Sequence, residues 1–502
     1  MLQFKGKEVF LSKIKKTMIK IYLKTLIVLL VLSSCKTKIT RTNQETVLDT
    51  ISHVEDSIYY EIDSLPMLCD VLGMEKQFVD IGDCKLYCEI EGKGIPMVVI
   101  NGGPGGTHHY FHPWFSEAAK YCRVIYYDQR GCGKSDFNPG ENGYSFEQAV
   151  DDLDKLRQKL GIEKWIVCGY SYGGAVAQFY TATHPQNVSG MVLISAMPVI
   201  KDKALNGTRE HDYISHEEKQ KIKAVYNLYN KHQITLQQLL YNKGINGDWK
   251  RQNFYKPTNN EFIRQSLYEW VNDNDFNSSV SATVARYNFK HLFDNCPIPA
   301  LLCEGEWDLT WKAEKKDIIR KNLPNAEFVL FEKSGHNIYY DEPDLFFLTL
   351  KKFVNQLKPV PDEQIQQWKI QTDKILGAQQ CLFRREANFF TLIKTAGIDK
   401  AAEYYRTFKS ENKKEALFTE SGMNALGYSY FKNTDYETAI KLFEMNVAEF
   451  PGSWNVYDSL GEGYLAAGNK EKAKENYEKA VRLNPDNTNG KTVLKELRQH
   501  SK

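Results

Sequence analysis

Two kinds of segment alternate along the middle of the chain. Short apolar runs at 97–100, 124–127, 165–168 and 191–194 are separated by longer segments in which apolar residues recur at helical spacing. Before one of these segments, Ser145 is a suitable N-cap for a helix. Apolar strands separated by helices predict a parallel sheet that helices cover on both faces.

The same pattern predicts where the sheet begins and where it is interrupted. Two runs at 78–81 and 85–90 predict a pair of strands ahead of the parallel ones. From about 200 to 297 the chain is polar and carries scattered aromatic residues, and we expect a helical insertion, or cap. Apolar runs resume at 299–303 and 328–331, which predicts two further strands.

The C-terminal part repeats itself with a period of 34 residues. Leu426, Gly427, Tyr430, Ala439, Phe443 and Pro451 recur as Leu460, Gly461, Tyr464, Ala473, Tyr477 and Pro485. This is the period of the tetratricopeptide repeat, in which helix pairs stack on one another. Residues 363–420 are also helical in pattern, and we expect them to complete the stack, because such units need neighbours to bury their faces.

The N-terminus has the pattern of an export signal. Lysines crowd the first 24 residues, and the apolar run 26–32 follows them, too short to cross a bilayer as a helix. The run ends in Leu32-Ser33-Ser34-Cys35, which resembles a bacterial lipobox. The resemblance implies cleavage before Cys35 and lipidation of its thiol. Met1 and Met18 are both candidates for the start, because the signal is complete from Met18 onward.

We therefore expect a lipoprotein signal peptide over 1–34, a polar tether over 35–70, an α/β domain over 71–358 and an all-α repeat domain over 363–502. The chain would be lipid-anchored to a membrane of the cell envelope. Lys36 stands where some bacteria have an acidic retention residue, so by resemblance the outer membrane is favoured. The net charge of +2 excludes the clustered basic excess that nucleic-acid binding usually demands.

One motif predicts a nucleophile. The sequence Gly169-Tyr170-Ser171-Tyr172-Gly173 lies between the apolar strand 165–168 and a helical segment. In such a strand–turn–helix setting the turn is sharp and strained, and it exposes the serine hydroxyl beside the N-terminus of the helix. The pattern G-x-S-x-G is common by chance, so its setting carries the prediction that Ser171 is a nucleophile.

A glycine-rich loop predicts the oxyanion site. Residues 101–106, Asn-Gly-Gly-Pro-Gly-Gly, follow the strand 97–100. Nucleophilic attack on an ester or amide needs two backbone N–H groups directed at the developing oxyanion. One comes from this loop and one from the residue after the nucleophile, so we expect Gly103 and Tyr172.

The acid and the base are expected in the chain order Ser, Asp, His. Asp308 lies just past the strand 299–303, and His336 just past the strand 328–331. Loops at the carboxyl ends of parallel strands converge, so these side chains should meet Ser171. Glu306 is the alternative acid.

Histidines and cysteines do not predict a metal or cofactor site. His108, His109 and His112 fall within five residues, but no carboxylate or cysteine completes a known metal-ligand spacing. We therefore expect no metal and no cofactor. Asp128 and Arg130 are expected to brace the loop below the active site.

Three motifs together resemble the prolyl iminopeptidase group of α/β-hydrolases. They are Gly102-Gly103-Pro104-Gly105-Gly106, Asp128-Gln129-Arg130-Gly131-Cys132-Gly133-Lys134-Ser135 and the Ser171 turn. The resemblance covers about 76–358 and implies an α/β-hydrolase fold and a serine peptidase that removes N-terminal residues, often proline, from short peptides. Asn101 replaces the usual His of the group, and Tyr172 and Gly174 replace the Trp and Ser of many members.

The resemblance also implies that carboxylates, several of them on the cap, recognise the free amine of the substrate. The candidates are Glu217, Glu218, Glu269, Asp273 and Asp275, each of which could instead be a solvated surface charge. The alternatives in function are an esterase or other carbonyl hydrolase acting on a small acyl substrate, and a tethered protein whose repeats bind a protein partner.

Overall fold

The computed structural model describes residues 72–139, 143–201, 215–246, 255, 266–267, 274–308, 310 and 313–499. The expected signal peptide, the tether and the lipidation residue Cys35 lie outside these residues. Among the described helices, none combines the length and the apolar character needed to span a membrane.

An eight-stranded sheet forms the centre of the α/β domain, with strand order β1-β2-β4-β3-β5-β6-β7-β8. Its strands are β1 (Glu75–Asp80), β2 (Lys85–Gly92), β3 (Ile95–Ile100), β4 (Cys122–Tyr127), β5 (Trp165–Tyr170), β6 (Val188–Ile194), β7 (Ala300–Gly305) and β8 (Glu327–Phe331). β2 pairs antiparallel with β1 and with β4, and the strands from β4 to β8 pair in parallel. The predicted strands and the parallel sheet are confirmed.

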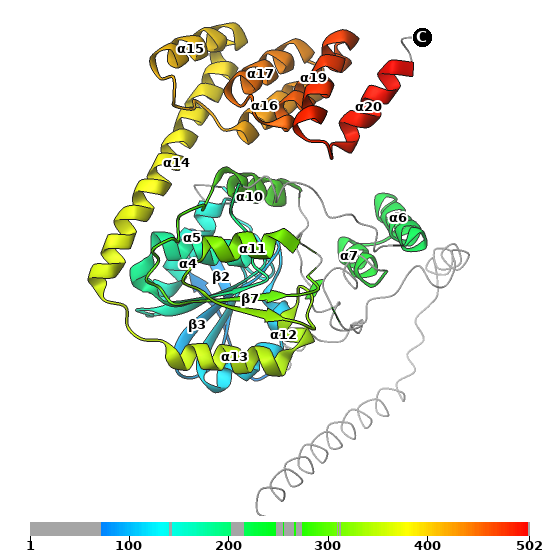
Figure 1. Cartoon of the computed structure of the whole chain (residues 1–502). Coiled ribbons are helices and arrows are strands. Elements are labelled where there is room, and N and C mark those ends of the chain that lie inside the picture. The colour runs from blue at the N-terminus through cyan, green and yellow to red at the C-terminus, as the bar shows by residue number, and fades with distance from the viewer. Residues whose placement is uncertain are drawn as a thin grey trace, which may run out of the picture. The chain divides into compact units, whose positions relative to one another are not determined.

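Helices lie on both faces of this sheet (Figure 1), and buried apolar side chains form one cluster on each face. Val98 and Ile100 of β3 pack into one cluster, and Met97 and Val99 pack into the other. The strands are apolar at successive positions because each face contacts a layer of helices. The helices and short 3₁₀ turns of the domain are η1 (His108–Phe111), η2 (Trp114–Lys120), α4 (Phe146–Lys159), α5 (Tyr172–Thr183), η3 (Pro185–Asn187), α11 (Ala313–Asn322), α12 (Ile338–Asp341) and α13 (Pro343–Gln356).

The described part of the insertion between β6 and β7 consists of helices joined by turns and loops. It contains α6 (His216–Asn230), α7 (Leu236–Ile245) and α10 (Asn274–Arg286). Reciprocal side-chain and backbone hydrogen bonds fix the start of α6 at Ser215 and that of α7 at Thr235. The predicted N-cap Ser145 is likewise confirmed, because its hydroxyl accepts a hydrogen bond from the Gln148 N–H at 3.1 Å.

The C-terminal region is all helical. Its helices are α14 (Asp362–Ala396), α15 (Ile398–Glu411), α16 (Glu420–Lys432), α17 (Tyr436–Glu449), α18 (Trp454–Ala466), α19 (Lys470–Leu483) and α20 (Thr488–Gln499). A Cβ on Gly427 would lie 2.4 Å from the Phe443 ring, and one on Gly461 would lie 3.0 Å from the Tyr477 ring. The 34-residue period therefore reflects a packing contact that occurs in both repeats. In each repeat, a glycine of one helix lies against an aromatic ring of the next helix.

Helix α14 contributes to both parts of the molecule. In its first half, Trp368 and Leu376 pack into the core of the α/β domain, and the Trp368 indole N–H donates to the Leu292 carbonyl oxygen at 3.1 Å. In its second half, Phe389 and Ile393 pack with the helices that follow. The sequence predicted that this segment belongs to the repeat stack, whereas the structure uses its first two turns and more to cover the α/β domain.

Candidate active site

Ser171 lies in the turn between β5 and α5. Its backbone has φ +54° and ψ −119°, which is a rare conformation for a residue with a side chain. A Cβ on Gly169 would lie 2.2 Å from the Gly173 carbonyl oxygen, and one on Gly173 would lie 2.1 Å from the Ile100 carbonyl oxygen. The turn is tight enough to require glycine at both positions, and it leaves the Ser171 side chain half-buried at the edge of the sheet.

The glycine-rich loop lies directly against this turn. A Cβ on Gly102 would lie 3.1 Å from the Ser171 Cβ, and Gly103 has φ +126°. The loop is closed by a hydrogen bond of 3.2 Å from the Gly106 N–H to the Gly102 carbonyl oxygen. The structure therefore places the loop that carries Gly103 against the Ser171 turn, and Tyr172 is the residue after Ser171 in that turn.

Asn101 connects the ends of this loop. Its amide donates to the Gly106 carbonyl oxygen, and the Gln129 amide donates at 3.3 Å to both the carbonyl and the side-chain oxygen of Asn101. Asn101 is fully buried. The sequence marked Asn101 only as a departure from the resembling group, and the structure shows that its side chain holds the loop together.

His336 and Asp308 form a buried pair. The His336 Nδ1 lies 2.8 Å from the Asp308 Oδ2, and the side chains are 6% and 1% exposed. The Thr310 N–H donates to the other Asp308 carboxylate oxygen at 2.9 Å. The two loops touch, because a Cβ on Gly305 would lie 2.1 Å from the Gly335 carbonyl oxygen.

Tyr170 joins this pair to the Ser171 turn. Its ring lies 5.0 Å from the His336 ring, and its hydroxyl donates to the Asn337 side-chain oxygen at 2.8 Å. Ser171 is the next residue, so the turn that carries it lies near the His336–Asp308 pair at this edge of the sheet. Among the described residues, no hydrogen bond joins the Ser171 hydroxyl to His336, and such bonds often tighten only when substrate binds.

The alternative acid, Glu306, lies elsewhere. Its side chain is 50% exposed, and its carboxylate lies 3.4 Å from the Lys316 ammonium. The buried acid that sequence reasoning missed is Asp341, whose carboxylate accepts from the Gly335 N–H at 2.8 Å. Asp341 fixes the loop that carries His336. No motif marks Asp341, since its importance depends on a partner that only folding supplies.

The five predicted amine-binding carboxylates differ in their surroundings, and only part of them lies among the described residues. Glu217 is exposed and lies 2.9 Å from the Lys221 ammonium. Glu218 accepts a hydrogen bond of 2.8 Å from the Ser215 N–H and so caps α6. Glu269 and Asp273 lie outside the described residues, as does the side chain of Asp275.

The histidine-rich segment is buried among carboxylates. The His108 Nδ1 lies 2.8 Å from the Asp128 Oδ1, and the His112 Nε2 lies 3.1 Å from Glu89. Burial opposes ionisation of Glu89, but the His112 and His108 rings and the Tyr87 hydroxyl outweigh it and lower the pKa of Glu89 to about 2. These histidines thus have carboxylate partners inside the protein.

Arg130 is also held by carboxylates. Its Nε and Nη2 donate to Asp152 at 2.7 and 2.8 Å, and Nη2 also donates to Asp83 at 3.0 Å. The Asp152 side chain is 3% exposed. Such a bidentate pair fixes the loop after β4 relative to α4.

Residues 95–343 match the family model described as alpha/beta hydrolase fold, and residues 425–453 and 454–487 match models described as tetratricopeptide repeat. Together with the sheet order and the Ser171 turn, these matches define the class of the molecule. The chain has an α/β-hydrolase fold followed by a helical region with tetratricopeptide repeats.

Among curated proteins, the chain is similar to proline iminopeptidases. It is 26% identical over 278 residues to that of Saccharolobus solfataricus, covering 54% of this chain and 88% of the relative. It is 26% identical over 289 residues to that of Lactobacillus delbrueckii subsp. bulgaricus, covering 54% and 95%.

Among solved structures, an esterase from Exiguobacterium antarcticum matches with a TM-score of 0.45 and 23% identity, covering 56% of this chain and 100% of that one. A proline iminopeptidase from Mycobacterium smegmatis matches with a TM-score of 0.42 and 20% identity, covering 56% and 98%. The curated relatives thus show that the α/β-hydrolase part of the chain is similar to proline iminopeptidases.

Proposed function

We propose that this chain is a serine hydrolase that cleaves carbonyl compounds through an acyl-enzyme. Ser171 is the nucleophile, His336 the general base, and Asp308 the acid that orients the imidazole. The 2.8 Å contact between His336 and Asp308, at the same sheet edge as the strained Ser171, is the observation that carries the proposal. A carboxylate on Nδ1 fixes the tautomer in which Nε2 can accept a proton.

The proposed reaction is acyl transfer in two steps. The Ser171 Oγ attacks the substrate carbonyl carbon while the His336 Nε2 takes the hydroxyl proton, and the N–H groups of Gly103 and Tyr172 stabilise the oxyanion. The imidazolium then gives its proton to the leaving amine or alcohol as that bond breaks. Water, deprotonated by His336, attacks the acyl-enzyme and releases the acid and the free Ser171.

For the substrate, we propose an N-terminal residue of a short peptide, of the proline type. The similarity to proline iminopeptidases of Saccharolobus solfataricus and Lactobacillus delbrueckii, over 88% and 95% of their lengths, supports this choice. The amine would be bound by cap carboxylates.

Esterase activity is the second candidate. Of the five amine-binding candidates, Glu217 and Glu218 already have partners on their own helix, which leaves the described part of the cap with fewer carboxylates for an amine. A proline arylamide and a short-chain p-nitrophenyl ester, assayed side by side, separate the two. Higher kcat/KM on the arylamide supports the peptidase, and turnover of the ester alone supports the esterase.

The assignment of Ser171 as the nucleophile is tested against a control substitution at a second serine with a positive φ. Ser195 at the end of β6 also has a positive φ, +44°, and is buried. Ser171→Ala should lower kcat by about 10³-fold or more and abolish labelling by a fluorophosphonate probe. Ser195→Ala should keep both. Labelling of the Ser171→Ala protein would reject the assignment.

For the location, we propose a lipid anchor on Cys35 in the cell envelope. The support is the run of lysines, apolar residues and Leu-Ser-Ser-Cys at the N-terminus. Metabolic labelling with an alkynyl fatty acid should mark the whole chain but not a Cys35→Ser variant. The repeats are proposed to bind a protein partner, which photo-crosslinking in cells from exposed positions such as Leu483 would capture.

A further inference from the structure

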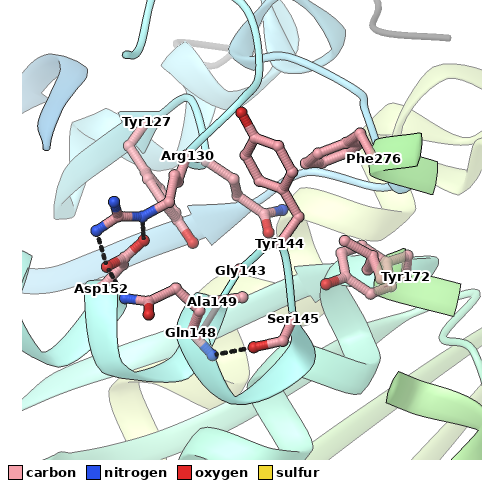
Figure 2. Close-up of a pocket in the computed structure, with 12 residues that line it drawn as sticks. Tyr127, Arg130, Gly143, Tyr144, Ser145, Gln148, Ala149, Asp152, Tyr172 and Phe276 are labelled. Atoms are coloured by element: carbon pink, nitrogen blue, oxygen red, sulfur yellow. Dashed lines mark hydrogen bonds and ion pairs between the residues drawn. The ribbon is translucent and has the colours of Figure 1, made fainter. Parts of the chain in front are cut away.

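Helix α10 belongs to the cap by sequence, but its apolar face is part of the core of the α/β domain. Phe276, Val280 and Val284 are buried in the apolar cluster on one face of the sheet. The Phe276 ring meets the Tyr144 ring edge to face, with centroids 4.9 Å apart (Figure 2). Because close packing holds a helix in place, α10 is a rigid support for the polar side chains that it carries.

One of these side chains, Asn277, reaches the oxyanion loop. Its amide N–H donates a hydrogen bond of 2.8 Å to the Pro104 carbonyl oxygen, across 173 residues of sequence. Pro104 follows Gly103, the predicted oxyanion donor. A Cβ on Gly102, in the same loop, would lie 3.1 Å from the Ser171 Cβ. Asn277 thus binds the loop at its tip, close to the turn that carries the nucleophile.

The tip of this loop depends on contacts from outside it. Hydrogen bonds from the Asn101 amide to the Gly106 carbonyl oxygen, and from the Gly106 N–H to the Gly102 carbonyl oxygen, join the two ends of the loop. Between these ends, Gly103 and Gly105 have φ of +126° and +103°, and glycine can easily adopt other values. An oxyanion site is effective only if its N–H groups are held in place before the reaction. The direction of the Gly103 N–H therefore depends on what holds the tip.

The other end of the Asn277 side chain is not stabilised by a partner. Its Oδ1 is buried and accepts no hydrogen bond from a described residue. A buried acceptor without a partner lowers stability, and an apolar side chain of the same shape does not have this cost. Stability alone therefore does not account for an asparagine at this position, whereas the hydrogen bond to the oxyanion loop does.

We propose that Asn277 is a positioning residue for the acyl transfer. By holding the Pro104 carbonyl group, Asn277 keeps the Gly103 N–H directed at the developing oxyanion. Its role is exerted through the loop and requires no contact with the substrate. The inference rests on the proposed function of Ser171, because it concerns the transition state of that reaction.

Thr283 of the same helix offers a matched control. Its hydroxyl accepts a hydrogen bond of 2.9 Å from the Phe146 N–H at the start of α4. Like Asn277, Thr283 joins α10 to the backbone of the α/β domain, but its partner is α4 rather than the oxyanion loop. Thr283→Val removes this hydrogen bond and keeps the shape of the side chain.

The test compares Asn277→Leu with Thr283→Val in the full chain. On the proline arylamide or the p-nitrophenyl ester, whichever the wild type turns over, Asn277→Leu should lower kcat about 10- to 100-fold, because misplacing a catalytic group by about 1 Å costs about 10²-fold. KM should change less than about twofold, and the melting temperature should not fall, because the unpartnered Oδ1 is removed. Thr283→Val should keep kcat and lower the melting temperature, because it leaves a buried N–H without a partner.

Inhibition by phenylboronic acid provides a second measurement. The Ser171 Oγ forms a bond to the boron atom while the hydroxyl proton passes to His336, and the tetrahedral, anionic adduct resembles the transition state. Asn277→Leu should raise the inhibition constant by about the factor by which it lowers kcat/KM. Thr283→Val should leave the inhibition constant unchanged.

If circular dichroism shows that Asn277→Leu does not fold, Asn277→Ala takes its place. The inference is overturned if a folded Asn277 variant keeps the wild-type kcat and the wild-type affinity for phenylboronic acid. It is also overturned if kcat and melting temperature fall together in both α10 variants, since Asn277 would then be an ordinary structural contact. Failure of the proposed function is a distinct result: the wild type itself would show neither turnover nor labelling of Ser171 by the fluorophosphonate probe, and the inference would be rejected with it.

Discussion

Two histidines in this molecule hold an aspartate at the same distance, yet their surroundings differ. His336 and Asp308 are 2.8 Å apart, and so are His108 and Asp128. The second ring nitrogen of His108 faces another carboxylate, Glu89, at 3.6 Å. His336 makes no other hydrogen bond to the described residues and lies against the Tyr170 ring.

The difference teaches what a general base needs. An imidazole between two carboxylates is held in place electrostatically, because a carboxylate lies near each of its ring nitrogens. An imidazole with one carboxylate has a fixed orientation and a nitrogen left for a reacting hydroxyl. The His108 cluster is therefore expected to serve stability, and the His336 pair is expected to serve turnover.

The largest difference between the two histidines is expected when each imidazole is removed in turn. His336→Ala should lower kcat by about 10⁴- to 10⁶-fold, and it should lower the melting temperature less than His108→Ala does, because it leaves one buried carboxylate, Asp308, without its ring partner rather than two. His108→Ala should lower the melting temperature strongly, because it leaves Asp128 and Glu89 buried without their partner. Steady-state kinetics and thermal unfolding of both variants show which histidine serves turnover and which serves stability. Equal losses of activity at equal stability would contradict the distinction.

The aspartates give the next largest effect. Asp308→Asn should lower kcat about 10⁴-fold, because an amide favours the wrong imidazole tautomer. Asp128→Asn should instead cost about 3–5 kcal/mol of unfolding free energy, because Asp128 accepts from two backbone N–H groups as well as from His108. Urea unfolding and kinetics on the same preparations measure both. If the Asp308→Asn protein is folded and fully active, another acid orients the His336 imidazole.

The dependence of stability on pH provides a further test of the carboxylates around His108. The pKa of Glu89 falls from 4.5 to about 2 on folding, so its ionised form stabilises the protein above about pH 5. That contribution is lost as the pH falls from 5 toward 2. Glu89→Gln should lower the melting temperature at pH 7 and flatten its decrease between pH 5 and 3. The control is Glu117→Gln, at an exposed side chain, which should keep the wild-type slope.

The smallest effect is expected at Glu306. Its carboxylate is half-exposed beside Lys316 and away from His336, so Glu306→Gln should change kcat less than about twofold and stability by less than about 0.5 kcal/mol. A loss of several orders of magnitude in kcat would show that Glu306, not Asp308, orients the base.

The sequence by itself determined the strands, the helices, the 34-residue repeats and the turn that carries Ser171. Each of these is encoded by neighbours along the chain: apolar periodicity selects the element, and glycines at 169 and 173 allow the close backbone contacts of the turn. The order of strands then placed His336 and one of two acids near Ser171, because parallel strands end at one edge.

The tertiary structure alone decided which acid faces the imidazole, since Glu306 and Asp308 are two residues apart and only backbone geometry separates them. It also decided the partners of Asn101 and the role of Asp341. These depend on contacts between residues distant in the chain, for which local sequence carries no signal. Helix α14 also depends on such contacts. Its helical pattern is continuous, and only the packing shows which part contacts the core of the α/β domain and which part contacts the core of the repeat region.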